Sequence, residues 1–282
     1  MMDLRISAPP PGYDQLLLHT LWLRLPTQQA FIPAGLSPSI MLIVRGSAEL
    51  LLEDGSRVTS PRFFLRGPYT EPVHVEYAPD TIAMSVCFIP GMLAKNCKVE
   101  VGSLINTIVP LEEIFDAQLV TRFLESIDAH NDADHHIHDF HHFLSQVLVA
   151  KQRNFIGEAF MAAHQKIFFP LMDLTAHFGI GERQLERRVR ASFGINLREL
   201  RRIARFGFTI QRIINQGSTW GDLTRVAQES GYYDQAHMHK EFNDLAGVNP
   251  TTLLQRIAAK DPAYWLYLLS PQDFKKLFIA VE

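Results

Sequence analysis

Cysteine is scarce in this sequence of 282 residues, and Cys87 and Cys97 do not have the CxxC spacing of a metal-ligand pair. We therefore expect no disulfide framework, and we expect both thiols to be buried and reduced in a cytoplasmic protein. No run of about 18 apolar residues occurs, so no membrane-spanning helix is predicted. The first residues, MMDLRISAPPPGYD, lack the charged head and apolar run of a signal peptide.

Charge is distributed unevenly along the chain. Residues 1–150 hold 9 Lys and Arg against 17 Asp and Glu, a net charge of −8, whereas residues 151–260 hold 16 against 10, a net charge of +6. This asymmetry favours a polyanion as the partner of the second part only.

Short apolar runs separated by turn residues predict an N-terminal β domain over residues 1–110. The runs include SIMLIVRG, AELLLEDG, RFFLRG, PVHVEY and TIAMSVCFIP. Asp54-Gly55, between AELLLE and SRVT, is the strongest hairpin signal in the chain. Strands spaced this closely indicate an antiparallel sandwich or small barrel.

Helical periodicity begins after Pro110. Residues 111–152 are expected to form a helical linker or dimerisation segment of two helices, interrupted around His130-Asn131-Asp132. Residues 153–260 are expected to form a separate domain that contains two helix-turn-helix units, with residues 155–260 helical throughout. A tail, residues 261–282, contains Trp265, Leu266 and Phe274, and we expect it to pack on one of the domains.

Two helix-turn-helix patterns lie in the basic region. In the first, Gly179 stops a helix, and Leu185, Val189 and Phe193 form the buried stripe of the next helix. Arg183 and Arg187 share a different face, as a helix in a DNA major groove requires.

In the second pattern, Gly231 makes the turn, Asp234 caps the following helix, and Met238, Phe242 and Leu245 form the stripe. Between the patterns runs a helix that begins with the capping-box-like Asn196-Leu-Arg-Glu199 and ends at Gly217. Its length of roughly 30 Å is close to the ~34 Å between successive turns of one DNA groove.

Residues 170–256 resemble the DNA-binding domain of the AraC/XylS family of transcription regulators. The stretches RQLERRVRASFGINLRELRRIARF and VAQESGYYDQAHMHKEFNDLAGVNP carry this resemblance. It implies a cytoplasmic regulator that binds an operator in double-stranded DNA, commonly as a homodimer, and that contacts RNA polymerase if it is an activator. It also implies a β-rich effector or dimerisation domain, here of a cupin-like kind, in front of the helical domain. The expected fold is therefore α+β.

The expected DNA-binding residues fall into readers of bases and contacts to phosphate. Arg183 and Arg187 are the best candidates to read guanine, because a guanidinium pairs with O6 and N7 together. The other expected DNA contacts are Gln184, Gln235, His237, Arg188, Arg190, Arg202 and Lys240, with Arg201 and Arg205 as further phosphate candidates. Gly181 stands where the family often has a capping Ser or Thr.

Six of the twelve histidines lie between residues 130 and 142: His130, His135, His136, His138, His141 and His142. His138 and His142 have a spacing that binds zinc on a helix, and Asp132, Asp134 and Asp139 could add ligands. A solvated linker and a pH-responsive surface are the alternatives, and we expect no metal or other cofactor.

In the β domain, His19, Trp22, Tyr69 and His74 are candidates to bind a small-molecule effector, with core packing as the other interpretation. The recognisable motifs of hydrolases, nucleotide-binding enzymes and zinc proteases are absent, so we do not expect an enzyme. The alternatives are a β-barrel enzyme that binds a small molecule or metal and carries a helical accessory domain, and a scaffold that binds protein through the same helices.

Overall fold

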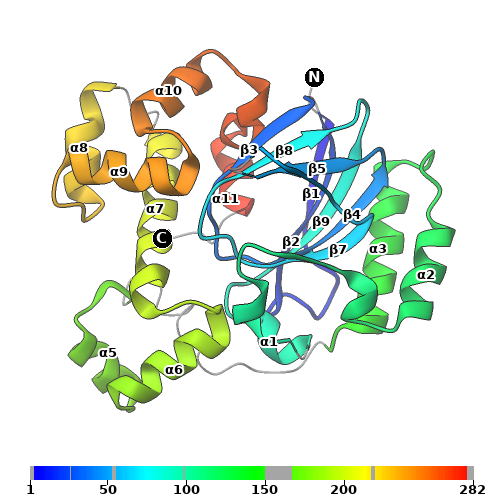
Figure 1. Cartoon of the computed structure of the whole chain (residues 1–282), viewed down its shortest axis with the longest axis horizontal. Helices are drawn as coiled ribbons and strands as arrows, with labels where there is room; N and C mark the ends of the chain where they lie inside the picture. The colour runs from blue at the N-terminus through cyan, green and yellow to red at the C-terminus, as the bar shows by residue number, and fades with distance from the viewer. Residues whose placement is uncertain are drawn as a thin grey trace.

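The structure, a computed structural model, describes residues 3–25, 27–52, 55–97, 99–149, 167–216 and 220–277. Two antiparallel sheets form its N-terminal half, and helices form its C-terminal half (Figure 1). One sheet has the strand order β1-β2-β9-β4-β7-β10 and the other β3-β8-β5-β6. The strands are β1 (Asp3–Ser7), β2 (Leu17–Arg24), β3 (Gln29–Ile32), β4 (Ser39–Arg45), β5 (Ala48–Leu51), β6 (Arg57–Thr59), β7 (Phe63–Arg66), β8 (Val73–Tyr77), β9 (Ile82–Phe88) and β10 (Ile108–Pro110).

The N-terminal domain is a sandwich and not a closed barrel. Within the described residues, the edge strands β1 and β10 of the larger sheet pair only with their inner neighbours, so no ladder joins the two sheets. The expected hairpin is confirmed by the pairing of β5 with β6, in which Leu51 lies opposite Arg57. Gly55 has a φ of 80° in this turn, and Asp54 lies outside the described residues.

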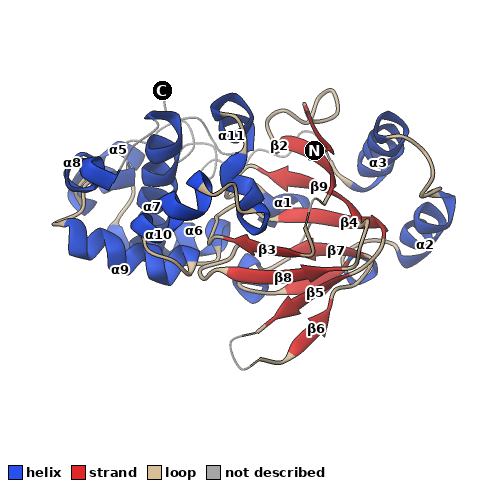
Figure 2. Ribbon diagram, turned by 90° about the horizontal axis from the view of Figure 1, so that it is seen from above, coloured by secondary structure: helices blue, strands red, loops and turns tan. Residues whose placement is uncertain are grey.

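Two helices, α2 (Ala117–Ser126) and α3 (Ala133–Val147), cover the outer face of the larger sheet (Figures 1 and 2). The predicted break between them is present, and Asp132 caps α3 by accepting a hydrogen bond from the backbone N–H of His135. Phe63 of β7 packs against Phe123, Phe140 and Phe143 of these helices. Three short helices precede them: α1 (Leu93–Asn96), η1 (Val101–Leu104) and η2 (Leu111–Glu113).

The C-terminal half consists of helices joined by tight turns. They are α5 (Leu171–Phe178), α6 (Glu182–Phe193), α7 (Leu197–Gln216), η4 (Trp220–Asp222), α8 (Leu223–Glu229), α9 (Gln235–Ala246), α10 (Pro250–Ala258), η5 (Pro262–Leu268) and α11 (Pro271–Leu277). Asn196 and Asp234 cap α7 and α9 as predicted, since each side chain accepts a backbone N–H three residues on. Gly217, the expected end of α7, lies outside the described residues.

The apolar cores do not follow the boundaries expected from the sequence. One cluster joins the inner faces of the sandwich to the buried stripes of the C-terminal helices, and a second lies between the larger sheet and α2 and α3. The segment from η5 to α11 packs on the β domain: η5 contacts β3, and α11 contacts β2. None of the described helices has the length and apolar composition needed to cross a lipid bilayer.

Candidate nucleic-acid interface and ligand cavity

The helix α6 has one buried face and one exposed basic face. Gly179, with a φ of 62°, ends α5, and α6 begins at Gly181 without a side-chain cap. Leu185, Val189 and Phe193 are buried as predicted. The N-terminal half of α6 therefore presents its remaining side chains to solvent.

Arg183 and Arg187 are exposed on α6, and neither makes an ion pair within the described part of the chain. Arg190 lies 3.6 Å from the carboxylate of Glu186 on the same helix. Gln184 and Arg188 are half-buried. The two arginines expected to read bases are thus available to a ligand.

The helix α9 offers a more polar and less basic surface. Gln235 accepts a hydrogen bond from Thr224 Oγ1 at 2.9 Å, and His237 Nε2 lies 3.4 Å from Glu241. Lys240 is exposed. Tyr233 is 90% exposed before α9 and was not among the residues predicted from the sequence. Its position two residues after the turn glycine Gly231 was the available signal.

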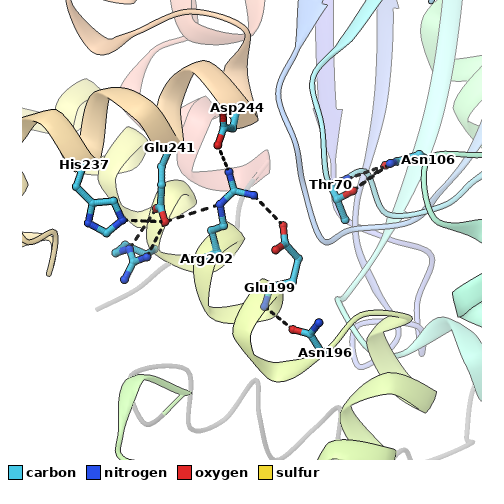
Figure 3. A network of polar contacts seen from close by, with 9 residues as sticks. Thr70, Asn106, Asn196, Glu199, Arg202, His237, Glu241 and Asp244 are labelled. Atoms are coloured by element: carbon cyan, nitrogen blue, oxygen red, sulfur yellow. Dashed lines mark hydrogen bonds and ion pairs between the residues drawn. The ribbon is translucent and has the colours of Figure 1, made fainter.

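A network of ion pairs between side chains holds α9 against α7 (Figure 3). Arg202 lies between Glu199 of its own helix, at 3.2 Å, and Asp244 of α9, at 2.6 Å. The buried carboxylate of Glu241 accepts a hydrogen bond from Arg205 at 2.9 Å and lies 3.7 Å from Arg202 Nε.

Arg202, Arg205 and Arg201 therefore differ from Arg187. Arg202 and Arg205 hold carboxylates of the protein, and Arg201 donates to the backbone carbonyls of Ile167 and Phe169. Their guanidinium groups hold parts of the helical domain together, and the phosphate contacts expected for them from the sequence remain predictions.

Both recognition-type helices touch the β domain at their C-terminal ends. Next to α6, Gly194 lies so close to η1 that a Cβ there would be 2.9 Å from the carbonyl oxygen of Val101. At the end of α9, the carbonyl of Leu245 accepts a hydrogen bond of 2.7 Å from the backbone N–H of Ala34. The β domain thereby holds the ends of α6 and α9 opposite to those that carry Arg183 and Gln235.

A cavity of about 220 Å³ lies between the two sheets of the β domain. It is larger than the ~150 Å³ apolar cavity that accommodates benzene. Both sheets line it, together with Trp265 and Leu266 of η5.

One row of residues makes one part of this cavity polar. Strand pairing places His19 opposite Cys87, Cys87 opposite Ser39, and Ser39 opposite Arg66. Residues directly opposite on antiparallel strands share a face of the sheet, and all four line the cavity. The next rows of the sheet are mostly apolar and consist of Leu21, Ser85, Met41 and Phe64, and then Leu23, Ala83 and Ile43. The cavity is therefore amphipathic.

Arg66 is the cation of the polar row, and its charge is poorly compensated. Its Nη2 is 3.5 Å from the carbonyl oxygen of Ser37, and its guanidinium lies 5.5 Å from the centre of the Tyr69 ring. Its buried Nε has no hydrogen-bond partner in the described part of the chain. Within the described residues, no carboxylate lies within 4 Å of it. A half-buried cation without an anion is costly, so this position favours a negatively charged group.

The positive charge of Arg66 also affects the pKa of the Cys87 thiol. Burial raises the pKa of Cys87, but His19 and Arg66 outweigh burial and hold this pKa below its ordinary value. Burial raises the pKa of the Cys97 thiol to about 12, and that thiol lies outside the cavity. Both cysteines are free, but only Cys97 is fully buried.

The four candidate effector residues separate into two groups. His19 and Tyr69 line the cavity. Trp22 points to the opposite face of the sheet, where its Nε1 donates to His136 Nδ1 at 3.1 Å. His74 stacks on Phe31 with ring centres 4.4 Å apart and does not line the cavity. The structure brings only His19 and Tyr69 together at one candidate site.

The histidines of residues 130–142 mostly serve to attach and cap α3. His136 is buried between Trp22 and the carbonyl of Asp128, and His141 lies 2.7 Å from Thr20 Oγ1. His135 contacts the capping Asp132, and His142 contacts Gln146. Within the described residues, no three His, Cys, Asp or Glu side chains gather in a way that could hold a metal ion.

Comparison with known proteins identifies the helical region. Residues 174–256 match the family model of a helix-turn-helix domain, whereas no curated protein sequence matches the chain. The structure is similar to that of ToxT from Vibrio cholerae, at 14% identity over 90% of this chain and 97% of that chain, with a TM-score of 0.45. A second ToxT structure, with an unsaturated fatty acid bound, has 14% identity over 90% and 94% and a TM-score of 0.44. The AraC-like transcriptional activator CuxR has 14% identity over 80% of this chain and 91% of that chain, with a TM-score of 0.28.

Proposed function

We propose that this protein is a sequence-specific transcription regulator of the AraC type that responds to a small-molecule effector in its β domain. The match of residues 174–256 to a helix-turn-helix family model supports this proposal. The observation that carries the DNA-binding part is the pair Arg183 and Arg187. Both are exposed on one helix and free of ion pairs within the described residues. A guanidinium so placed pairs with the O6 and N7 of guanine.

The second unit supports a two-part operator. The helix α7 has 20 residues, which gives a length of roughly 30 Å between the two units. Contacts from Gln235, Lys240 and Tyr233 would then fall in the next major-groove segment of the same duplex face. The weaker positive charge of α9 predicts that the half-site read by α6 contributes more affinity.

The amphipathic cavity supports an organic acid with an apolar body as the effector. Its acidic group would meet the uncompensated Arg66, and its body would lie along the apolar rows of the larger sheet. A neutral apolar ligand would leave the guanidinium without an anion, which is the less favourable arrangement.

The docking of α6 and α9 on the β domain supports a route from effector to DNA. Ala34 lines the cavity and also donates to Leu245 at the end of α9. A ligand that shifts the segment of Ala34 would change the position of α9 relative to α6. Because both helices must fit one duplex, a small shift alters affinity for a site of fixed spacing.

Selection of binding sites from a randomised duplex library tests the DNA-binding part. We expect enriched sequences with two motifs about 10–10.5 base pairs apart and an affinity that falls steeply as salt increases. Replacing Arg183 and Arg187 by alanine should erase one motif, whereas Gln235→Ala should weaken only the other. Counting the chains per duplex in the same complexes tests the expected homodimer.

Recovery of no common sequence by the wild-type protein would contradict the proposal. So would equal loss of both motifs in the Arg183→Ala, Arg187→Ala variant, because the two units would then not read separate half-sites.

A further inference from the structure

The segment η5 follows the helix-turn-helix residues 174–256 in the chain and contributes to the wall of the ligand cavity. Trp265 and Leu266 form part of the wall of a cavity that otherwise belongs to the β domain. These two residues are separated by more than 150 positions from the strands that form the remainder of the wall. The cavity is therefore complete only when η5 is seated.

The seat of η5 on the β domain is largely aromatic. The ring of Tyr264 stacks on Phe31 of β3 with centres 5.1 Å apart, and Phe31 stacks in turn on His74 of β8. Stacked pairs of this kind contribute about 0.5–1.5 kcal/mol each beyond area burial. Trp265, Leu266 and Tyr267 are also buried, so release of η5 costs hydrophobic burial as well as stacking. We therefore expect release to be infrequent in the free protein.

The polar atoms of this wall are incompletely satisfied. The indole Nε1 of Trp265 is buried and has no hydrogen-bond partner among the residues that the structure describes. A buried N–H without an acceptor carries a desolvation cost of about 1–3 kcal/mol. The seated segment thus holds a donor for which the described part of the chain supplies no acceptor, next to a cavity that also contains Arg66.

The other end of η5 is fixed to α10. Asp261 caps η5 by accepting from the backbone N–H of Ala263, and its other carboxylate oxygen lies 3.2 Å from Arg256 of α10. The Arg256 guanidinium also lies 5.9 Å from the centre of the Tyr264 ring. Since α10 packs against α9, a displacement of η5 is passed to the second helix-turn-helix unit.

We propose that η5 is a detachable wall of the cavity: it must leave its seat on Phe31 to admit a ligand, and Trp265 then closes over that ligand with its Nε1–H as a donor. This inference rests on the proposed function for the ligand, but the gating itself is a property of the protein alone. Opening of the cavity is thereby joined to the DNA-binding half through Asp261, Arg256 and α10.

Alkylation of Cys87 by iodoacetamide measures this gate without any ligand. Cys87 lies on the cavity wall with its pKa held low, whereas burial raises the pKa of Cys97 to about 12, so the full-length protein has one reactive position in the cavity. The rate at each cysteine is followed by mass spectrometry of peptides. In the wild-type protein we expect labelling of Cys87 at least about tenfold slower than in the urea-unfolded chain.

Two variants remove the seat from opposite sides. Tyr264→Ala takes the ring from η5, and Phe31→Leu takes its partner from β3. Each should accelerate labelling of Cys87 by roughly tenfold while Cys97 stays unlabelled. Phe168→Ala is the matched control: its exposed ring packs on Phe208 in the helical half, away from the cavity, and the rate should not change.

Labelling of Cys97 together with Cys87 in a seat variant would reveal that this variant is generally unfolded. In that case a third variant, Trp265→Phe, tests the proposed donor while the seat on Phe31 is kept. It keeps an aromatic side chain in the cavity wall but removes the Nε1–H, so the alkylation rate of the free protein should not change. Binding of octanoate, an organic acid with an apolar body that serves as the probe for the proposed effector, should become weaker. Rapid labelling of Cys87 in the wild-type protein, or equal rates in the wild type and in both seat variants, would overturn the gate.

Binding of wild-type protein to selected duplexes separates the two proposals. Gated labelling without sequence-specific DNA binding would reject the regulator and leave the gate. DNA binding without gated labelling would reject the gate and leave the regulator.

Discussion

Arginine serves three purposes in this protein, and the surroundings of each side chain decide which. Arg202 and Arg205 are held by carboxylates on α7 and α9, Arg187 is exposed without an ion pair in the described residues, and Arg66 is half-buried without one. Residue type alone does not distinguish these arginines from one another. The presence or absence of a nearby acid separates a structural arginine from one that is available to bind an anion.

Arg187→Ala tests the reading of bases by α6. If Arg187 contacts a guanine, the variant should lose about 1–3 kcal/mol of affinity for the selected site and relax preference at that base pair. Titrations on specific and random duplexes measure both effects. Arg122→Ala, an equal loss of charge on the exposed surface of α2, is the control and should change neither. Equal weakening on specific and random DNA would mean that α6 does not read sequence at Arg187.

Arg66→Gln tests the acidic effector. Loss of a hydrogen-bonded charge costs about 1.5–3 kcal/mol, so calorimetry should show octanoate bound roughly ten- to a hundredfold more weakly. Octan-1-ol has the same apolar body without the charge, and its binding should change by no more than about twofold. Arg57→Gln, on the exposed strand β6, should affect neither. Wild-type protein that binds the alcohol as tightly as the acid would contradict the assignment.

The polar row could not be predicted from the sequence, although each of its members is visible there. His19, Ser39, Arg66 and Cys87 lie on four strands separated by 20 to 27 residues along the chain. Their alignment depends on the register of each strand pair, and a slip of one residue would turn a side chain to the other face. The same cause explains Trp22, which was proposed for the effector site but faces α3.

At the scale of single elements, local signals predicted the helices well. The caps Asn196 and Asp234, the turn at Gly179 and the break before α3 all depend on contacts within a few residues. The seat of η5 was beyond prediction because Tyr264 and Phe31 are far apart in sequence. The helix-turn-helix residues were found by pattern, whereas the cavity required the folded chain.

The buried carboxylate of Glu241 connects α7 and α9, and its removal should loosen this pair. Glu241→Ala leaves Arg205 without its closest partner, so we expect a loss of about 1.5–3 kcal/mol in the free energy of unfolding. Denaturant titration followed by circular dichroism measures it. Glu229→Ala removes an exposed carboxylate that pairs with Arg225 and Arg212 on the same domain, and should cost no more than about 1 kcal/mol. Similar losses in both variants would show that burial adds nothing to the Glu241 contacts.

The turn after α6 depends on glycine. Gly194 has a φ of 77°, and a Cβ there would lie 2.9 Å from Val101 O and from Ile105 Cδ1. Gly194→Ala should therefore destabilise the protein by at least about 1–2 kcal/mol, as measured by thermal unfolding. Gly207→Ala, within α7 and with open space around it, should instead stabilise by about 0.5–1 kcal/mol. An unchanged melting temperature for Gly194→Ala would indicate that α6 is not docked on η1.

At the scale of the whole molecule, the C-terminal helical half contacts the β domain through the end of α6, the end of α9, η5 and α11. A fragment of residues 150–260 loses these contacts but keeps the stripes of its own helices. We expect it to be soluble, helical by circular dichroism and able to bind DNA without sequence preference. Its affinity for selected two-part sites should be lower than that of the full protein, because the β domain no longer orients α6 and α9. An unfolded fragment would show that the helical half depends on the β domain to fold.

The seat of η5 also imposes an order on biosynthesis. The strands that surround the cavity leave the ribosome long before Tyr264 and Trp265, which complete its wall. At translation rates of about 5–20 residues per second, the interval between Phe31 and Tyr264 is roughly 10–50 s. During that time the nascent β domain presents Phe31 and the apolar rows to its surroundings. The newly made chain is therefore open to capture by chaperones or by ligand before its DNA-binding half exists.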